Sequence, residues 1–475
     1  MPRFLHHRFR HPATFFAASF SVLALAACDS ADVTRPTPVP TAARVAAEQR
    51  VEESALRQLD HVIVIYLENR SFDNLYGEFP SADGLARAAD APPQVDATGT
   101  PYATLPAVPG MASIPTSLPN APFNIQQYVP ASVPTRDLVH RFYQEQAQID
   151  GGRMDRFALV SDAKGLVMGF YHTASLPLAR EAARYTLCDN FFHAAFGGSF
   201  LNHMWLIAAR TPVFPGAPAS AQVQLDAQGG LVKDGFVTPD GYAVNTAFSV
   251  NVPHPAGIPV ASLVPNQTFA TIGDRLSAKG ISWAWYAGGW NDALAGHPGP
   301  LYQFHHQPFI YFAHFADGTA AKAEHLKDEQ DFVQALAAGT LPAVAFVKPY
   351  GLANEHPGYT DLLTGETHVQ GLIDAVRASR IWRHTAIIIT YDENGGFWDH
   401  VAPPAGDRWG PGSRVPTLVI SPFARRGVVD HHRYDTTSIL ALIEHRWSLE
   451  PLSSRDAAAD PLSGAFRADG MGDEE

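Results

Sequence analysis

The sequence predicts an α/β fold with a mostly parallel central sheet and helices on both of its faces. Three segments carry this prediction, because each runs from a helical pattern into a short apolar strand. These helix and strand pairs are 268–279 with 281–286, 331–338 with 343–347, and 369–382 with 386–389. Glycine closes the first two helices, and the strands are almost continuously apolar, as in sheets covered on both faces.

Further segments complete the predicted domain. We expect strands at 60–67 and 416–420, and helices at 177–184, 201–209 and 438–447. Segments 90–130 and 212–265 are rich in proline and show no helical period, which indicates loop or small β insertions on one sheet. A single domain is therefore expected over residues 58–452, followed by a disordered tail at 453–475.

The charge balance excludes nucleic acid as a partner. The chain has a net charge of -13 and no basic tract, whereas nucleic acid requires a positively charged surface. Its composition, 46% hydrophobic and 17% charged, is typical of a globular protein and argues against wholesale disorder. A small phosphorylated substrate remains compatible, because a few cations inside a cleft can outweigh the net charge.

The N-terminal segment has the features of a targeting signal. Three arginines precede an apolar stretch at 15–27, which is too short to span a membrane. Because Leu25-Ala26-Ala27-Cys28 resembles a bacterial lipoprotein signal, we expect a signal peptide at 1–27, a lipid on Cys28 and a flexible tether at 28–57. This predicts an exported protein, anchored by lipid to a bacterial membrane and facing the periplasm or the cell surface. Ordinary secretion with an incidental cysteine is the alternative.

Two predicted strands end in groups of polar oxygen donors. Strand 60–67 leads into Glu68 and Asn69, and strand 386–389 leads into Asp392 and Glu393. In open α/β sheets the ligand site lies outside the carboxyl ends of the strands. The pattern therefore indicates one shared site for a hard divalent cation. Alternatively, these residues only cap strands and begin turns.

Ser199 follows Gly197-Gly198 and begins a helical run. The free N–H groups of a helix N-terminus favour an anion, so a phosphoryl group could be held there while Ser199 attacks it. A metal ion would activate the hydroxyl, and Asn202, one turn further on, could bind a phosphoryl oxygen. A plain helix N-cap explains the serine equally well.

Four histidines could supply positive charge for binding a phosphate group. All of them lie in polar or turn segments: His140, His305, His306 and His356. His356 also follows a predicted strand. Protonated imidazoles could bind a phosphate dianion or donate a proton to a leaving alkoxide. A structural role is the alternative for each lone histidine.

Five motifs together resemble the phosphoesterase family, which contains bacterial non-haemolytic-type phospholipases C and a group of acid phosphatases. They are Glu68–Asp73, Gly197–Ser199, His305-His306, Glu355–Pro357 and Asp392–His400, in the same order over about residues 58–450. The resemblance implies the fold of the alkaline phosphatase superfamily.

It also implies roles for individual residues. One divalent cation would be bound by Glu68, Asn69, Asp392 and Glu393, and Ser199 would form a phospho-enzyme. The phosphate pocket would be lined by His140, Asn202, His305, His306 and His356. Asp399 and His400 are expected to orient their loop or to support the site from behind it.

The resemblance favours a phosphomonoesterase, because phospholipase C members usually have threonine where this chain has Ser199. A phospholipase C or other phosphodiesterase is the alternative, and a surface lipoprotein without activity is a third. Oxygen ligands suit Ca²⁺, Mg²⁺ or Mn²⁺ better than Zn²⁺, although carboxylates bind zinc as well.

We predict that the mature protein begins at Cys28 and carries lipid there. Mass spectrometry of the membrane fraction measures this directly, and Cys28→Ser should move the protein out of that fraction. Cys188→Ser is the matched control and should leave its location unchanged. An unmodified N-terminus at another residue would refute the lipoprotein interpretation.

Overall fold

A computed structural model describes residues 55–467. The predicted signal peptide, Cys28 and all of the predicted tether except residues 55–57 lie outside the described residues. Ala55 and Leu56 are buried, so the domain begins by Ala55. Within 55–467, no helix is long and apolar enough to cross a membrane.

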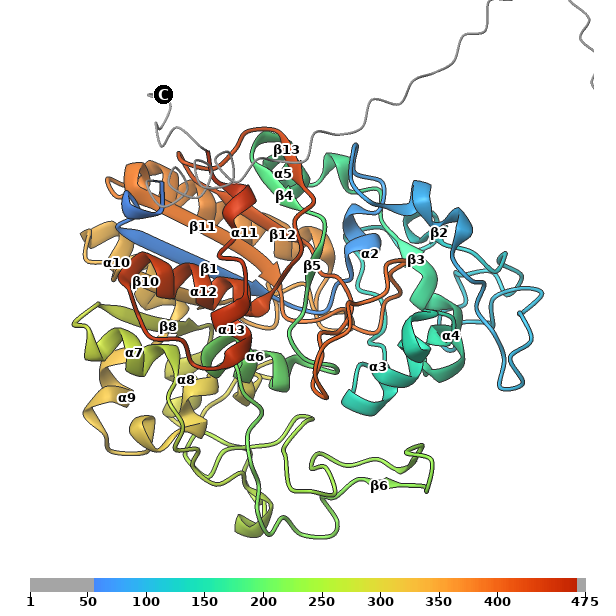
Figure 1. Ribbon diagram of the computed structural model, residues 1–475, viewed down its shortest axis with the longest axis horizontal. Coiled ribbons are helices and arrows are strands. Elements are labelled where there is room, and N and C mark those ends of the chain that lie inside the picture. Colours follow the sequence, from blue (N-terminus) through green and yellow to red (C-terminus); the bar gives the residue numbers. More distant parts are fainter. Residues whose placement is uncertain (1–54, 468–475) are drawn as a thin grey trace, which may run out of the picture. The chain divides into compact units, whose positions relative to one another are not determined.

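The domain is built on an eight-stranded sheet (Figure 1). In sheet order its strands are β13 (Val428–Asp430), β4 (Thr186–Cys188), β12 (Thr417–Ile420), β11 (Thr385–Tyr391), β1 (His61–Leu67), β10 (Val344–Lys348), β8 (Trp283–Ala287) and β9 (Leu326–Asp328). β12 pairs antiparallel with both of its neighbours, and every other pair in this sheet is parallel. The prediction of a mostly parallel α/β sheet is confirmed.

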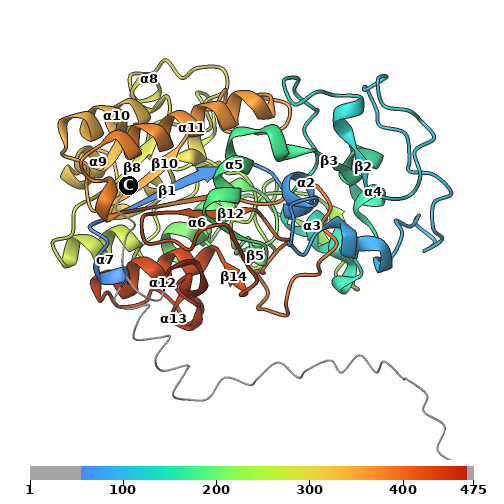
Figure 2. The same cartoon turned by 90° about the horizontal axis from the view of Figure 1, so that it is seen from above.

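Helices cover both faces of the sheet (Figure 2). One layer contains α5 (Pro177–Arg184), α10 (Glu329–Ala338) and α11 (Leu362–Ala378). The other contains α6 (Ser199–Ala208), α7 (Ile272–Ala278), α12 (Thr436–Trp447) and α13 (Ser454–Ala458). Between these layers the central strands β1, β10 and β11 are fully enclosed, which explains why their sequences contain few polar residues.

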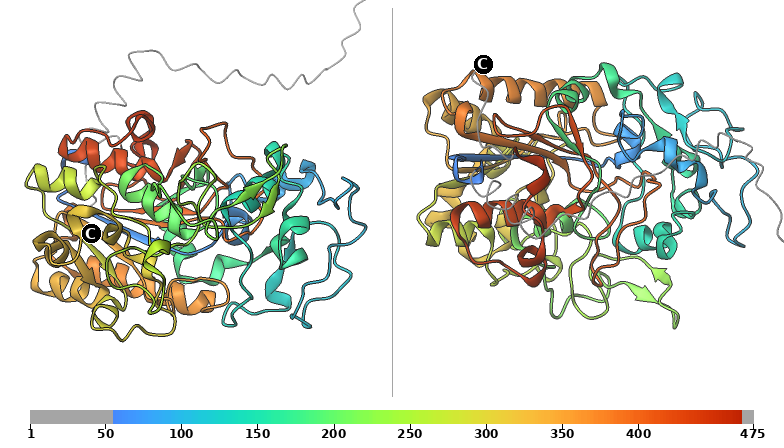
Figure 3. Two further views of the ribbon diagram at one scale, coloured as in Figure 1. Left: turned by 90° about the horizontal axis from the view of Figure 1, so that it is seen from below. Right: turned by 45° about the horizontal axis from the view of Figure 1, so that its top comes forward.

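The remaining elements are short. They are α2 (Phe72–Tyr76), β2 (Phe123–Asn124), α3 (Phe142–Ile149), α4 (Phe157–Val160), β3 (Gly169–Phe170), β5 (Phe191–Phe192), β6 (Gln224–Leu225), β7 (Leu231–Lys233), α8 (Trp290–Leu294), α9 (Ala320–His325) and β14 (Tyr434–Asp435). Three of them, β2, β6 and β7, lie in the two predicted insertions. Residues 72–170, blue to teal in Figures 1 and 3, lie beyond the end of the sheet toward which β1 runs. The two predicted insertions are confirmed, and the second contains the β6–β7 hairpin.

The prediction of a disordered tail from residue 453 is wrong for residues 453–467. Ser453 caps α13, and its hydroxyl accepts a hydrogen bond from the backbone N–H of Arg455. Leu462, Ala465 and Phe466 are buried against the core. The polar composition of the segment predicted disorder, but these three apolar residues pack against the core and hold the segment in place.

Candidate active site

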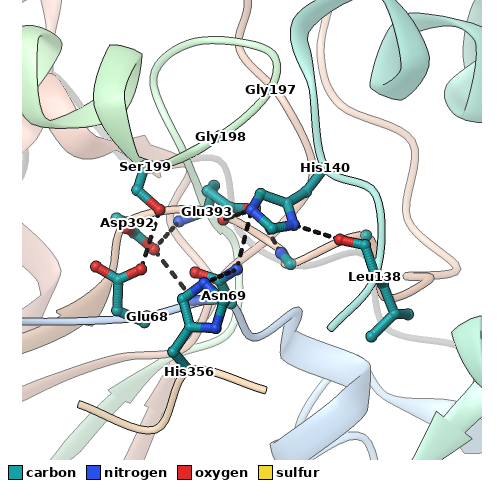
Figure 4. Close-up of polar contacts among 12 residues, drawn as sticks. Glu68, Asn69, Leu138, His140, Gly197, Gly198, Ser199, His356, Asp392 and Glu393 are labelled. Carbon is teal, nitrogen blue, oxygen red and sulfur yellow. Dashed lines mark hydrogen bonds and ion pairs between the residues drawn. The ribbon is translucent and has the colours of Figure 1, made fainter. Parts of the chain in front are cut away.

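The carboxyl ends of three neighbouring strands deliver the charged residues of the site. β1 lies between β10 and β11 and is followed by Glu68 and Asn69. β11 is followed by Asp392 and Glu393, and β10 ends in Lys348. All five residues are fully buried. Parallel strands end at the same edge of a sheet, so segments more than 300 residues apart converge here (Figure 4).

Glu68 contacts a different partner with each carboxylate oxygen. The Ser199 hydroxyl donates to its Oε2 atom at 3.0 Å. Its Oε1 atom lies 2.8 Å from Nε2 of His306 and also contacts the ammonium group of Lys348. Burial alone raises the pKa of Glu68, but the attraction of Lys348 and His306 outweighs burial and holds the pKa well below its usual value.

Asn69 is oriented by two histidine rings. His140 and His356 donate from Nδ1 to the backbone carbonyls of Leu138 and Pro357, at 2.5 and 2.6 Å. Their Nε2 atoms are therefore acceptors, and each lies 3.3 Å from the Asn69 side-chain nitrogen. Because that nitrogen donates to both rings, the Asn69 Oδ1 atom is left as a free acceptor, and it has no hydrogen-bond partner.

The acidic residues after β11 also present free oxygens. Oδ1 of Asp392 accepts from the backbone N–H groups of Asn69 and Glu393, at 3.1 and 2.8 Å. Oδ2 of Asp392 and Oε1 of Glu393 have no hydrogen-bond partner. Burial raises the pKa of both carboxyls well above their usual values, and neighbouring carboxylates raise it further.

These free oxygens fit a metal ion. Buried oxygen acceptors without partners are costly, and a bound cation removes that cost. Asn69, Asp392 and Glu393 supply amide and carboxylate oxygens, the donor set preferred by hard divalent cations. Glu68, Asn69, Asp392 and Glu393, the predicted metal-binding set, all lie buried at this edge of the sheet. Among the described residues, however, Asp392 and Glu393 belong to no group of three acidic, histidine or cysteine ligands whose atoms all lie within 4.8 Å of one another.

A second set of possible ligand atoms adjoins this cluster. Glu68, His203 and His306 each offer an atom, and these atoms lie within 4.8 Å of one another. His203 was not predicted as a site residue. Its Nδ1 atom lies 2.7 Å from the Ser199 carbonyl, its ring stacks on His306 at 5.3 Å, and its Nε2 atom is buried without a partner.

Ser199 is the first residue of α6, and its hydroxyl does not cap that helix. The N-cap is Gly198, which makes no side-chain capping bond. The hydroxyl instead points at Glu68 from 3.0 Å, as Figure 4 shows. The N-cap alternative therefore fails to describe this serine, and a nucleophile beside a carboxylate cluster describes it well.

The two glycines before Ser199 are required by close packing. Gly197 has a φ of 86°, and a Cβ there would lie 2.5 Å from the Phe142 backbone nitrogen. A Cβ on Gly198 would lie 2.9 Å from the His140 carbonyl oxygen. Glu145, which was not predicted, accepts from the Gly197 N–H at 2.5 Å and helps to fix the loop.

Asn202 does not line the phosphate pocket as predicted. Its side-chain nitrogen donates to the carbonyls of Ala195, Gly197 and Gly198, at 3.0, 3.1 and 3.3 Å. Its Oδ1 atom accepts from the Ala195 N–H at 2.9 Å. The amide is therefore fully used in holding the loop that carries Ser199. Spacing of one helical turn placed Asn202 near the site but did not reveal where the amide points.

His305 and His306 lie side by side in the 3-10 turn Phe304–His306, and both are buried. Burial lowers the pKa of His305, and it lowers that of His306 to about 4. Burial also lowers the pKa of His203 and His356. Burial therefore opposes the protonation expected for His305, His306 and His356, whereas His203 was not part of that expectation. All four rings are suited to act as neutral N–H donors or as lone-pair ligands.

Asp399 and His400 lie outside the cluster, in a separate ion network. Nε of Arg414 donates to Asp399 at 2.8 Å, and Nδ1 of His400 lies 2.7 Å from Asp73. Asp73 in turn accepts a second contact from Arg414 at 3.3 Å. Arg414 supplies the positive charge that this network needs, so it ties the loop after β11 to α2.

A pocket of about 760 Å³ adjoins the site. His140 and Gly198 belong both to its wall and to the surroundings of Ser199. Met111 and Leu138 supply apolar surface, while Arg136 is paired with Asp162 at 2.6 Å. The pocket is large enough for an organic substituent attached to a phosphoryl group at Ser199.

Lys348 is the main site residue that sequence reasoning missed. The predicted strand ended at Val347, one residue too early, and so excluded it. The signal was present, because Lys348 is the one charged residue of β10 and stands at its carboxyl end. A charge that ends a buried apolar strand needs a partner, and here the partners are Glu68 and Asp392, the latter at 3.7 Å.

The sequence matches a known protein family. Residues 59–450 match the phosphoesterase family. The chain belongs to this family. It is 25% identical to phospholipase C B of Mycobacterium tuberculosis over 456 residues, covering 86% of this chain and 78% of the relative. It is also 25% identical to a non-hemolytic phospholipase C of Pseudomonas aeruginosa over 480 residues, covering 91% of this chain and 60% of the relative. This phosphoesterase is thus a hydrolase of phosphoric esters.

Solved structures that resemble the phosphoesterase include a protein of the alkaline phosphatase superfamily from Vibrio parahaemolyticus. That match has a TM-score of 0.34 and 9% identity, and covers 70% of this chain and 73% of the other. The lipoteichoic acid synthase LtaP from Listeria monocytogenes also has a TM-score of 0.34, with 8% identity and coverage of 88% and 82%.

We predict that Asp392→Asn combined with Glu393→Gln abolishes metal binding and leaves the fold intact. The change removes two anionic ligands but keeps the shape of both side chains. Metal content per chain and circular dichroism measure the two effects. Glu444→Gln is the control, because burial raises the pKa of Glu444 to about 9 and its neutral acid resembles glutamine. Unchanged metal content in the double variant would refute the ligand assignment.

Proposed function

We propose that this protein is a metal-dependent phosphomonoesterase of the acid phosphatase type, which hydrolyses small phosphate esters through a phospho-serine at Ser199. The observation that carries the proposal is the Ser199 hydroxyl, which hydrogen-bonds to a carboxylate of the oxygen cluster instead of capping its helix. The pocket at His140 and Gly198 gives room for the organic part of the ester.

The proposed reaction has two displacements. Oγ of Ser199 forms a bond to phosphorus while the bond to the alcohol oxygen breaks, and the hydroxyl proton passes toward Oε2 of Glu68. Glu68 releases the serine proton to water, and the departing alkoxide takes up a proton from water and leaves as the alcohol. Water then attacks the phospho-serine, releases inorganic phosphate and restores the hydroxyl. A divalent cation, when bound, supplies the positive charge that lowers the pKa of the serine and stabilises the phosphoryl oxygens.

The residues of this chain position these steps. Asn202, Glu145 and the two glycines fix the loop, so Ser199 stays aimed at the cluster. A neutral His305 ring can donate one hydrogen bond to a phosphoryl oxygen without adding fixed charge, whereas the single N–H of a neutral His306 ring is engaged by Oε1 of Glu68. Because the metal ligands of the first cluster are all oxygen atoms, Ca²⁺, Mg²⁺ or Mn²⁺ is proposed ahead of Zn²⁺.

A phospholipase C is the second candidate. It is favoured by the names of both bacterial relatives, each of which is called a phospholipase C. The same serine and cluster would serve it, with phosphocholine or a similar group retained on Ser199 and a diacylglycerol as the leaving alcohol. We also propose that the enzyme is exported and held at a membrane by lipid on Cys28.

We predict that Ser199→Ala folds, keeps its metal and loses turnover by several orders of magnitude. Its hydroxyl makes no capping bond, so stability should fall little. Ser453→Ala is the matched control, because that serine does cap a helix. The control should lose about 1 kcal/mol of stability and keep its rate. Near-normal turnover in Ser199→Ala would end the proposed mechanism, and acid trapping of labelled phosphate on the Ser199 peptide tests it independently.

We also predict that the metal-loaded wild-type enzyme prefers a chromogenic phosphomonoester over its diester and over phosphatidylcholine. The assay compares kcat/KM for the three substrates at a series of pH values, with Ser199→Ala as the blank. Faster hydrolysis of phosphatidylcholine would favour the phospholipase C. Hydrolysis of none of the three would contradict both candidates.

A further inference from the structure

Lys348 reaches across the sheet edge to two acidic residues from different strands. It is the last residue of β10, and its side chain passes the end of β1. There its ammonium group contacts Oε1 of Glu68 and lies 3.7 Å from Oδ2 of Asp392. It also donates to the Leu67 carbonyl at 3.3 Å and lies 5.1 Å from the centre of the Tyr66 ring.

These contacts hold the ammonium group in one place. A buried lysine is stable when anions, carbonyls or aromatic faces replace its water, and all three are present here. Lys348 is fully buried, so solvent does not screen its charge. Its ammonium group is therefore held at a fixed position beside Glu68 and Asp392.

The ammonium group contacts the carboxylate oxygen of Glu68 that a second metal ion would need as a ligand. Glu68, His203 and His306 form a set of possible ligands, with one atom from each lying within 4.8 Å of the others. Oε2 of Glu68 faces Ser199, which leaves Oε1 for this set. Lys348 contacts Oε1 and would repel any metal ion bound beside it.

The charge balance of the cluster leads to the same conclusion. Glu68, Asp392 and Glu393 carry three negative charges when ionised, and Lys348 cancels one of them. One divalent cation among the oxygens cancels the other two. Before a phosphate ester binds, a second divalent cation would leave two uncompensated positive charges among these residues and ions in a fully buried site, which is strongly unfavourable.

We propose that Lys348 is a built-in cation that excludes a second metal ion from the Glu68, His203 and His306 set, so that the enzyme works with a single divalent ion. This deepens the proposed function, on which it rests for the catalytic use of the cluster. Removal of the ammonium group is expected to open a latent site with two imidazole ligands and one carboxylate. Such a mixed nitrogen and oxygen set suits Zn²⁺.

The test counts metal ions in Lys348→Met, which keeps the length of the side chain and removes its charge. Metal-free protein is dialysed against Mn²⁺ and Zn²⁺ together, and the ions per chain are measured by mass spectrometry. We expect one ion in the wild type and two in Lys348→Met, the additional one being zinc. Adding His203→Ala to Lys348→Met should return the count to one, because it removes a ligand of the second set.

Two variants control for charge and for burial. Lys348→Arg keeps a cation and should keep one ion. Lys322→Met removes another buried lysine, which pairs with Asp317 outside the site, and should also keep one ion. Circular dichroism checks folding, and Lys348→Gln serves as the second variant if the methionine form does not fold.

A single ion in both folded Lys348 variants that lack the cation would overturn the proposal, and so would two ions in the wild type. The count needs no turnover and is repeated in the Ser199→Ala background. A wild type that binds one ion and hydrolyses no phosphate ester would therefore refute the proposed function and leave this inference intact. An active wild type that binds two ions would refute this inference and leave the proposed function intact.

Discussion

The carboxylate of Glu68 joins the parts of the site that distant segments supply. One oxygen accepts the hydrogen bond of Ser199, from the start of α6, and the other contacts Lys348, from the end of β10. Glu68 itself follows β1, the strand between β10 and β11. Its position is fixed by the parallel register of these strands, so the sheet and the nucleophile are aligned through one side chain.

Electrostatic cost explains why the site needs cations. Three carboxyl groups gathered without water repel one another, and burial raises the pKa of Asp392 and Glu393 well above their usual values. Lys348 stabilises the anionic form of Glu68 and, from 3.7 Å, that of Asp392. Without a cation, protonation neutralises such buried carboxyls, so we propose that a metal ion takes the place of these protons. Metal binding and the ionisation of these carboxyls are thus one coupled event.

Sequence alone predicted the central sheet and most of the cluster, for a physical reason. Enclosed strands must be apolar, and the polar residues directly after them must lie at one edge, so the strand ends identified Glu68 and Asp392. The direction of a side chain is not encoded in this way. Asn202 lies at the predicted distance from Ser199, yet its amide binds backbone carbonyls of the loop. Lys348 was missed because the strand boundary was placed one residue early.

The two glycines located the Ser199 loop in the sequence, but they did not show which segment packs against that loop. In the structure, Gly197 and Gly198 allow residues 140–142 to pack closely against the loop. That packing also brings His140 toward Asn69, whose amide it orients. The glycines therefore act on the metal cluster as well as on Ser199. A side chain at either position would displace Ser199, the proposed nucleophile, together with Asn69, the proposed metal ligand, which couples the two halves of the site mechanically.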